Sequence, residues 1–203
     1  MNKIRVRNNN RINENVLKSI DRLRVNMDFV GPDKRVIAIT SASDREGKSF
    51  VAYQLACMQA VHDKKVILLH LDFRKNIGNK KNNLEGIAQV VENTVEVSNV
   101  MYKTDIRNMY MMFAGTTSEK AMDIVENPRF EKLINWLKGK FDYVIIDTAT
   151  IGKGMDSTVI CSKCDGAIIV TESGAVPYKK VQNVIEQIRM ADCEVLGAVI
   201  NNR

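Results

Sequence analysis

The segment Val36-Ile37-Ala38-Ile39-Thr40-Ser41-Ala42-Ser43-Asp44-Arg45-Glu46-Gly47-Lys48-Ser49 joins an apolar run to a Gly-Lys-Ser triplet. The apolar run is typical of a buried strand, and the residues that follow, up to His62, are typical of a helix. The triplet therefore lies at a strand-to-helix turn, where backbone N–H groups and the helix dipole can hold anionic oxygens. This arrangement predicts a phosphate-binding loop in which Lys48 reaches the terminal phosphates and Ser49 ligates Mg²⁺. The match is partial, because Ala42 replaces the first glycine of the usual eight-residue pattern.

The composition is that of an ordinary globular protein. The chain has 203 residues, of which 27% are charged and 45% are hydrophobic, enough to bury a substantial core. No apolar run approaches the roughly 20 residues that a membrane-spanning helix needs, and the N-terminus lacks the apolar core of a signal peptide. We therefore expect a cytoplasmic protein.

Four cysteines are too few to form the disulfide framework of a small secreted domain. The pair Cys161 and Cys164 has a spacing found in metal sites, but the sequence offers no second cysteine pair. Structural zinc sites usually need four ligands. Buried thiols on or near a helix are therefore the favoured interpretation over zinc.

The net charge of +6 is unevenly distributed along the chain. Its N-terminal part carries Glu14 and Asp21 against the basic residues Lys3, Arg5, Arg7, Arg11, Lys18, Arg22 and Arg24. We interpret residues 1–12 as a basic flexible arm and residues 13–203 as a single domain. The arm can contact an anionic membrane or an acidic partner, and a solvated tail explains it equally well. Nucleic acid is not favoured, because no known reader motif is present.

Strands and helices are predicted to alternate along most of the chain. The expected strands are 36–40, 66–71, 109–113, 143–146, 166–171 and 195–200. The expected helices are 48–62, 84–92, 118–125, 128–138, 156–162, 177–190, and an earlier one from Asn13 to the Gly31-Pro32 pair. Residues 93–107 show no clear pattern. Continuous apolar strands between helices predict an α/β fold, with a doubly wound, mainly parallel sheet covered on both faces.

Two aspartates, Asp72 and Asp147, directly follow or end apolar strands. An aspartate in this place can simply cap the next turn. Ligands of doubly wound sheets, however, bind at the carboxyl ends of the strands. Together with the loop, the two carboxylates predict a site in which Asp147 holds Mg²⁺ through water. Asp72 would then lie near the γ-phosphate or the attacking group.

Three segments resemble, in order, the motifs of bacterial protein-tyrosine kinases, the cytoplasmic P-loop kinases that regulate capsule and exopolysaccharide synthesis. Thr40–Ser49 is similar to their Walker A motif, Val66–Arg74 to their second Walker motif, and Phe141–Thr148 to their Walker B motif. The resemblance extends over nearly the whole chain from about Val16 and includes the closing segment Val195–Asn201.

The resemblance implies ATP and Mg²⁺ as cofactors and phosphoryl transfer to a tyrosine of a protein substrate. It implies, as activating partner, the cytoplasmic tail of a membrane polysaccharide co-polymerase, and hence a peripheral location at the inner face of the plasma membrane. The expected nucleotide-binding residues are Ser43, Asp44, Arg45, Glu46, Gly47, Lys48, Ser49, Phe50 and Asn201. The expected catalytic residues are Lys48, His70, Asp72 and Asp147. The expected Mg²⁺ ligands are Ser49, Asp72 and Asp147.

The sequence departs from the family pattern at positions that carry chemistry. Asp44-Arg45 replaces the family's Pro-Gly; arginine takes a positive φ only at a cost, and Asp44 adds negative charge near the phosphates. His70 replaces the first aspartate of the second Walker motif, and it could serve as a base or be a buried structural histidine. Thr150 replaces the proline after Walker B. The family's C-terminal tyrosine cluster has no counterpart in the sequence.

Three hypotheses follow from these residues. The first is an ATP-dependent tyrosine kinase that regulates capsular or exopolysaccharide synthesis or export. The second is a catalytically weakened nucleotide-binding subunit that regulates a polysaccharide export complex. The third is a partition- or septum-site-type ATPase, but those proteins carry a signature lysine where this chain has Ser43. We favour membership of the kinase family, with the catalytic activity left open by His70, Arg45 and the missing tyrosine cluster.

Assembly is also expected to differ from the family. Family members form rings through a helix with a Glu-x-x-Arg-x-x-Arg pattern, whose positions here are Lys18, Asp21 and Arg24. The first two have reversed charge, and misplaced charges at an interface can exclude a partner. We therefore expect a monomer or small oligomer in isolation.

Overall fold

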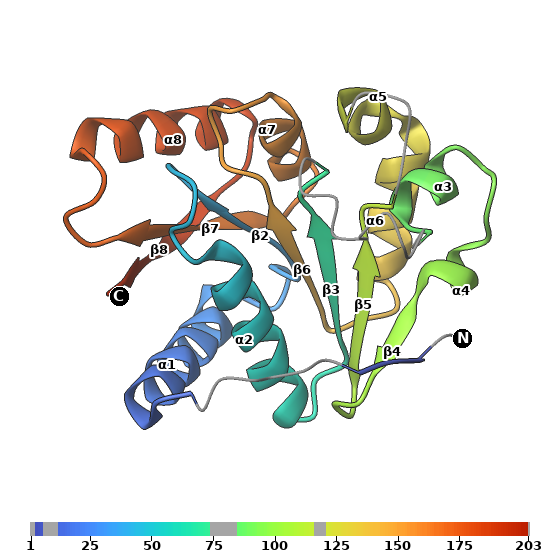
Figure 1. Ribbon diagram of the computed structural model, residues 1–203, viewed down its shortest axis with the longest axis horizontal. Coiled ribbons are helices and arrows are strands. Elements are labelled where there is room, and N and C mark those ends of the chain that lie inside the picture. The colour runs from blue at the N-terminus through green and yellow to red at the C-terminus, as the bar shows by residue number, and fades with distance from the viewer. Residues whose placement is uncertain (1–2, 6–11, 74–84, 116–120, 203) are drawn as a thin grey trace.

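The centre of the molecule is an eight-stranded sheet (Figure 1). The structure is a computed structural model that describes residues 3–5, 12–73, 85–115 and 121–202. The strands are β1 (Lys3–Ile4), β2 (Val36–Ser41), β3 (Val66–Leu71), β4 (Tyr102–Thr104), β5 (Met109–Phe113), β6 (Tyr143–Thr148), β7 (Gly166–Glu172) and β8 (Val195–Asn201). Their order in the sheet is β1-β4-β5-β3-β6-β2-β7-β8. All neighbours are parallel except β4 and β5, which are antiparallel.

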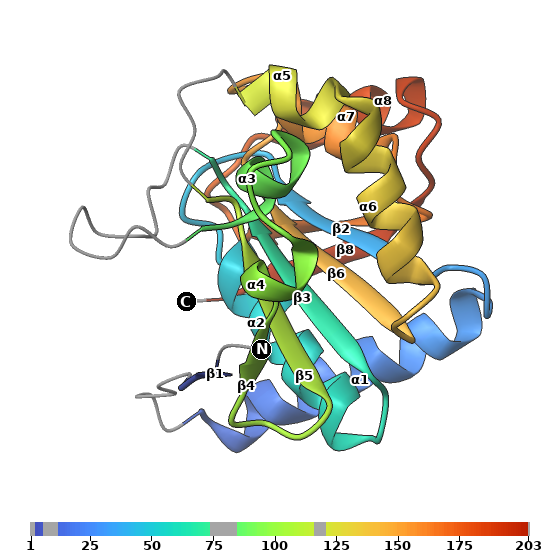
Figure 2. The ribbon, with the colours of Figure 1, turned by 90° about the vertical axis from the view of Figure 1, so that its right-hand side faces the viewer.

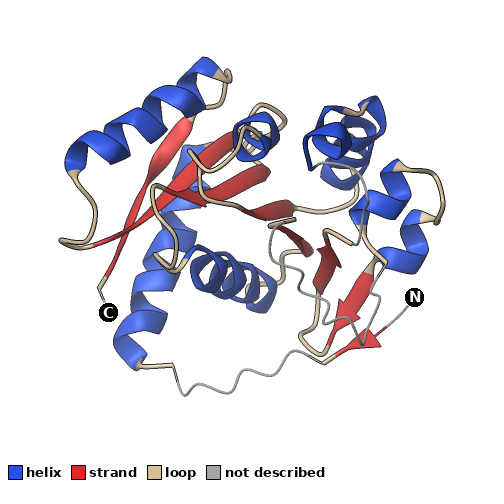
Figure 3. Cartoon of the chain, turned by 45° about the horizontal axis from the view of Figure 1, so that its top comes forward, coloured by secondary structure: helices blue, strands red, loops and turns tan. Residues whose placement is uncertain are grey.

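Helices cover both faces of this sheet (Figures 2 and 3). They are α1 (Glu14–Val30), α2 (Lys48–Val61), α3 (Ile87–Val91), α4 (Val97–Val100), α5 (Ala121–Glu126), α6 (Pro128–Lys138), α7 (Asp156–Cys161) and α8 (Tyr178–Met190). The doubly wound α/β fold predicted from the sequence is therefore confirmed.

The central strands are buried on both faces, as strand β3 illustrates. Its side chains alternate between two cores: Ile67 and Leu69 pack in one core with Phe130 of α6, and Leu68 packs in the other with Leu55 of α2. Because side chains of a strand point to opposite faces in turn, both sets must be apolar. This requirement explains the continuous apolar runs in the sequence.

Local sequence signals set several element boundaries. Helix α1 begins after Asn13, whose side chain accepts a hydrogen bond from the N–H of Asn15 at 2.9 Å, and it ends at Gly31. The predicted helix 48–62 is observed as α2, and the predicted strand 109–113 is observed as β5. The predicted starts of the helices 84–92 and 118–125 lie outside the described residues, as does the end of the second Walker motif at Arg74.

The sequence did not reveal β1, α4 or β4. These elements have two, four and three residues, too few for a periodic pattern. Strand β1 lies within the segment interpreted as a flexible arm, and it pairs with β4. Among the described residues, no helix has the length and apolar character needed to cross a membrane. The four cysteines are free, and Cys161 and Cys193 are buried.

Candidate nucleotide-binding site

The loop between β2 and α2 lies at the carboxyl end of β2 (Figure 1). Two of its residues have left-handed backbone conformations, Arg45 with φ 62° and Gly47 with φ 91°. A Cβ atom at Gly47 would lie 2.4 Å from Nδ2 of Asn201, so the chain needs glycine there for space as well as for backbone freedom. Arg45 adopts the positive φ expected to be unfavourable for a residue with a side chain.

The buried side chain of Glu46 stabilises the conformation of the loop. Its carboxylate accepts hydrogen bonds from the N–H of Ser43 at 2.5 Å and from the N–H of Glu172, at the end of β7, at 3.2 Å. Its backbone carbonyl accepts a hydrogen bond from Nδ2 of Asn201, at the end of β8, at 3.0 Å. The side chains of Glu46 and Asn201 thus hold the shape of the loop, and the ends of two further strands take part.

Lys48 is the first residue of α2 and is 4% exposed. Its ammonium group donates a hydrogen bond to Thr150 Oγ1 at 3.2 Å, and the Thr150 hydroxyl donates to Asp44 Oδ1 at 2.8 Å. Asp44 also forms an ion pair with Lys153. Hydrogen bonds from Lys153 and Thr150 lower the pKa of the Asp44 carboxyl to about 2. No pattern in the sequence marks Lys153 as a site residue, and Thr150 stands out only as the residue that replaces the family's proline.

The other loop residues lie around this group. Ser43 accepts a hydrogen bond at Oγ from the ammonium of Lys180, on α8, at 2.7 Å. Ser49 is half-buried in the first turn of α2. Phe50 is 39% exposed and lines a hollow of about 200 Å³ together with Val199 and other residues. This hollow also reaches Asn201, so it adjoins the loop.

The two aspartates predicted to lie near the loop are at the carboxyl ends of adjacent strands. Strands β3 and β6 are neighbours, and their register pairs His70 with Asp147. Strand β2 lies on the other side of β6, with Ile39 opposite Asp147. Asp147 is therefore next to the strand that leads into the loop, and Asp72 follows the adjacent strand. Both are buried, at 1% and 6% exposure.

His70 Nδ1 is in direct contact with Asp147 Oδ2. Within the described part of the chain, Asp147 Oδ1 has no hydrogen-bond partner. A buried carboxylate oxygen without a partner is unfavourable unless an ion or water satisfies it, and Mg²⁺ prefers such oxygen ligands. The predicted ligands Ser49, Asp72 and Asp147 carry the oxygen donors that Mg²⁺ prefers, and His70 is placed to orient Asp147.

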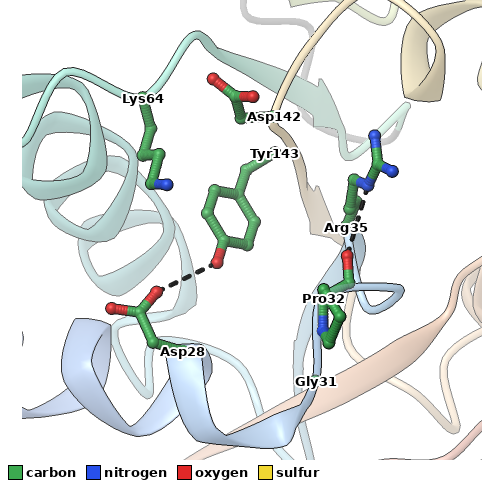
Figure 4. A pocket seen from close by; sticks show the side chains of 7 residues that line it. All are labelled: Asp28, Gly31, Pro32, Arg35, Lys64, Asp142 and Tyr143. Carbon is green, nitrogen blue, oxygen red and sulfur yellow. Dashed lines mark hydrogen bonds between the residues drawn. The ribbon is translucent and has the colours of Figure 1, made fainter.

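A second hollow, of about 550 Å³, lies at the opposite ends of the strands (Figure 4). It is lined by Asp28, Gly31, Pro32, Arg35, Lys64, Asp142 and Tyr143. Figure 4 shows the hydroxyl of Tyr143 donating to Asp28 Oδ1, at 3.3 Å, and Nε of Arg35 donating to the carbonyl of Pro32, at 3.3 Å. Because the loop is at the opposite edge of the sheet, this hollow is separate from the candidate site.

The fold and the loop define a P-loop nucleotide-binding protein. The family model AAA_31, described as an AAA domain, matches residues 34–196. Within this class, the chain belongs to the bacterial tyrosine-protein kinases. It is 30% identical over 183 residues to tyrosine-protein kinase CpsD of Streptococcus pneumoniae, a match that covers 88% of this chain and 81% of that protein. The family membership inferred from the three motifs is therefore confirmed.

Solved structures show the same fold. The kinase domain of Escherichia coli tyrosine kinase ETK superposes with a TM-score of 0.85 at 21% identity, over 97% of this chain and 84% of that one. The septum site-determining protein MinD of Pyrococcus horikoshii, complexed with Mg-ADP, superposes with a TM-score of 0.65 at 20% identity, over 82% and 70%. The fold is thus shared with this kinase domain and with this septum site-determining protein.

Proposed function

We propose that this protein binds Mg-ATP at the loop of residues 43–49 and transfers the γ-phosphoryl group to a tyrosine of a protein substrate. The observation that carries the proposal is the arrangement of the buried Lys48 at a helix start beside two buried carboxylates, Asp72 and Asp147, at adjoining strand ends. Membership of the tyrosine-protein kinases supports phosphoryl transfer. The family resemblance supports a role in capsular or exopolysaccharide synthesis.

Each residue has a role that follows from its position. The backbone N–H groups of the loop and the ammonium of Lys48 bind the phosphates. The hydroxyl of Ser49 and the carboxylate of Asp147 would hold Mg²⁺, which would neutralise charge on the phosphates. His70 orients Asp147 through its Nδ1 contact. Asp72 accepts the proton of the tyrosine hydroxyl. At the same time the tyrosine oxygen forms a bond to the γ-phosphorus, and the bond from that phosphorus to ADP breaks, so that ADP leaves.

The binding part of the proposal is tested by calorimetry with Mg²⁺ and a non-hydrolysable ATP analogue. We expect binding by the wild type and no detectable binding by Lys48→Met. Lys64→Met is the matched control, because Lys64 lies on the exposed surface at the opposite edge of the sheet. Equal affinity in the wild type and Lys48→Met would show that the nucleotide does not bind at this loop.

The catalytic part is tested with labelled ATP. The acceptors are a tyrosine-containing polypeptide and the cytoplasmic tail of a co-polymerase, the partner that the resemblance implies and that would bring the protein to the inner face of the membrane. Transfer of label to tyrosine supports the kinase. Nucleotide binding without transfer to either acceptor supports instead the second hypothesis, a regulatory subunit that acts through nucleotide occupancy.

A specific observation favours that second hypothesis as the alternative. His70 stands where the family has a carboxylate, and it contacts Asp147 rather than leaving a pair of acidic groups. Arg45, with φ 62°, and Asp44 also change the loop. These residues preserve nucleotide binding through Lys48 while altering the groups nearest the reacting phosphate.

A further inference from the structure

A continuous line of polar contacts joins the loop lysine to the segment after β6. The hydroxyl of Thr150 accepts from the ammonium of Lys48, at 3.2 Å, and donates to the carboxylate of Asp44, at 2.8 Å. Lys153 forms an ion pair with the other oxygen of that carboxylate. Asp44 therefore lies a single hydroxyl group away from the ammonium that would bind the terminal phosphates.

The charge of Asp44 is fixed under ordinary conditions. The lowered pKa of its carboxyl, about 2, keeps it ionised throughout the physiological range. The Lys48 ammonium is one of the groups that lower this pKa, which places the two charges within electrostatic reach of each other. A phosphate bound at Lys48 would bring further negative charge beside Asp44, and like charges this close repel.

The outer side of the same group of residues is a hollow of about 250 Å³, lined in part by Ser43, Asp44, Thr150, Lys153 and Lys180. Two ammonium groups face it, of which Lys153 is paired with Asp44 and Lys180 donates to Ser43 Oγ at 2.7 Å. A ligand with an additional phosphate would enter a region that contains the ionised carboxylate of Asp44 and the ammonium groups of Lys153 and Lys180, which can exchange their present partners for a phosphate. This region can therefore distinguish ligands by their number of phosphates.

We propose that the Asp44–Lys153 ion pair determines the selectivity of the site between nucleoside diphosphate and triphosphate. With the pair closed, the Lys153 ammonium is bound to Asp44 and is not available to the terminal phosphate, so the site prefers ADP. Binding of ATP breaks the pair, and Lys153 exchanges Asp44 for the terminal phosphate. This inference rests on the proposed nucleotide site and deepens it, since it assigns specificity to two residues outside the Gly-Lys-Ser triplet.

The test is calorimetry with Mg-ADP and with the Mg²⁺ complex of a non-hydrolysable ATP analogue. The measured quantity is the ratio of the Kd of the ATP analogue to the Kd of ADP. Asp44→Asn removes the charge and retains the shape, and we expect it to lower the ratio by about tenfold, a modest effect for a half-exposed charge. Lys153→Met removes the cation that the terminal phosphate would acquire, and we expect it to raise the ratio by about tenfold.

The control is Asp33→Asn, which removes an exposed carboxylate from the turn between α1 and β2; its ratio should stay within about twofold of the wild type. Thermal unfolding of each variant verifies that it is folded. If both nucleotides bind and Asp44→Asn leaves the ratio within twofold, the ion pair does not set selectivity, although the nucleotide site stands. If neither nucleotide binds the wild type, the proposed function fails and this inference fails with it.

Discussion

Replacing Gly47 by alanine tests how the loop is built. Gly47 has φ 91°, and a Cβ atom there would lie 2.4 Å from Nδ2 of Asn201. The backbone conformation costs a residue with a side chain about 1–2 kcal/mol. In addition, the amide of Asn201 must move away and give up its hydrogen bond to the carbonyl of Glu46, worth about 1 kcal/mol. Gly47→Ala should therefore lower the free energy of unfolding by about 2–3 kcal/mol.

The contact part of this destabilisation can be separated from the backbone part by a double-mutant cycle. Asn201→Ala alone should lower the free energy of unfolding by about 1 kcal/mol, because the same hydrogen bond is lost. In the double variant the bond is lost only once, so its destabilisation should be about 1 kcal/mol smaller than the sum of the two single effects. The measurement is urea unfolding followed by circular dichroism, without nucleotide.

Gly152 supplies the matched control. Its φ is 93°, close to that of Gly47, but a Cβ there would meet nothing within 4 Å. Gly152→Ala should thus cost only the backbone term, about 1–2 kcal/mol, and should add to Asn201→Ala without coupling. If Gly47→Ala and Asn201→Ala also add to within about 0.5 kcal/mol, the contact between the two residues is not what requires glycine in the loop.

Three further predictions concern pH, catalysis and assembly. Burial acts to raise the pKa of Asp165, but hydrogen bonds from Lys138 and from the backbone N–H of Val36 lower this pKa overall. The stabilisation of the folded protein by the ionised Asp165 is therefore complete above a pH of about 4 and is lost as the pH falls further. Asp165→Asn should lower the free energy of unfolding by about 1–3 kcal/mol at pH 7, and urea unfolding at pH 3 should show a smaller difference; an equal difference at both pH values would exclude this origin. His70→Asp restores the family's carboxylate and should raise tyrosine phosphorylation at least about tenfold in the labelled-ATP assay; an unchanged rate would show that His70 does not limit transfer. Arg24 donates to Asp21 at 2.8 Å and to Asp28 at 3.2 Å within α1, so light scattering should find a monomer or small oligomer, and a ring stable in moderate salt would contradict this.

The sequence predicted those parts of the molecule whose signals are local. The apolar run from Val36 and the Gly-Lys-Ser triplet defined β2, the loop and the start of α2, because burial on both faces of a parallel sheet leaves a continuous apolar pattern. Asp72 and Asp147 were expected beside the loop because each stands at the end of an apolar strand, and the carboxyl ends of parallel strands meet at one edge of the sheet. The antiparallel strand β4 was missed because three residues carry no periodicity.

The rest of the site depends on contacts between distant parts of the chain. The sequence around Lys153 and Lys180 indicates only two ordinary surface lysines. Their partners in the loop are 109 and 137 residues away along the chain. No local pattern specifies such pairs. For His70 the sequence left two interpretations, a catalytic base or a structural histidine. Only the register of β3 against β6 shows that its side chain meets Asp147.

The position of β2 between β6 and β7 has a consequence for how the chain acquires its shape. The loop after β2 appears early in the sequence, but the groups that hold it are Thr150, Glu172 and Asn201. Pairings between such distant segments form slowly, because the chain must first close long loops. On the ribosome, residues 43–49 therefore remain without their final geometry until the segments that carry Thr150, Glu172 and Asn201 have emerged. Nucleotide affinity should appear late in refolding, after most helical structure, and it would report completion of the sheet rather than formation of the loop alone.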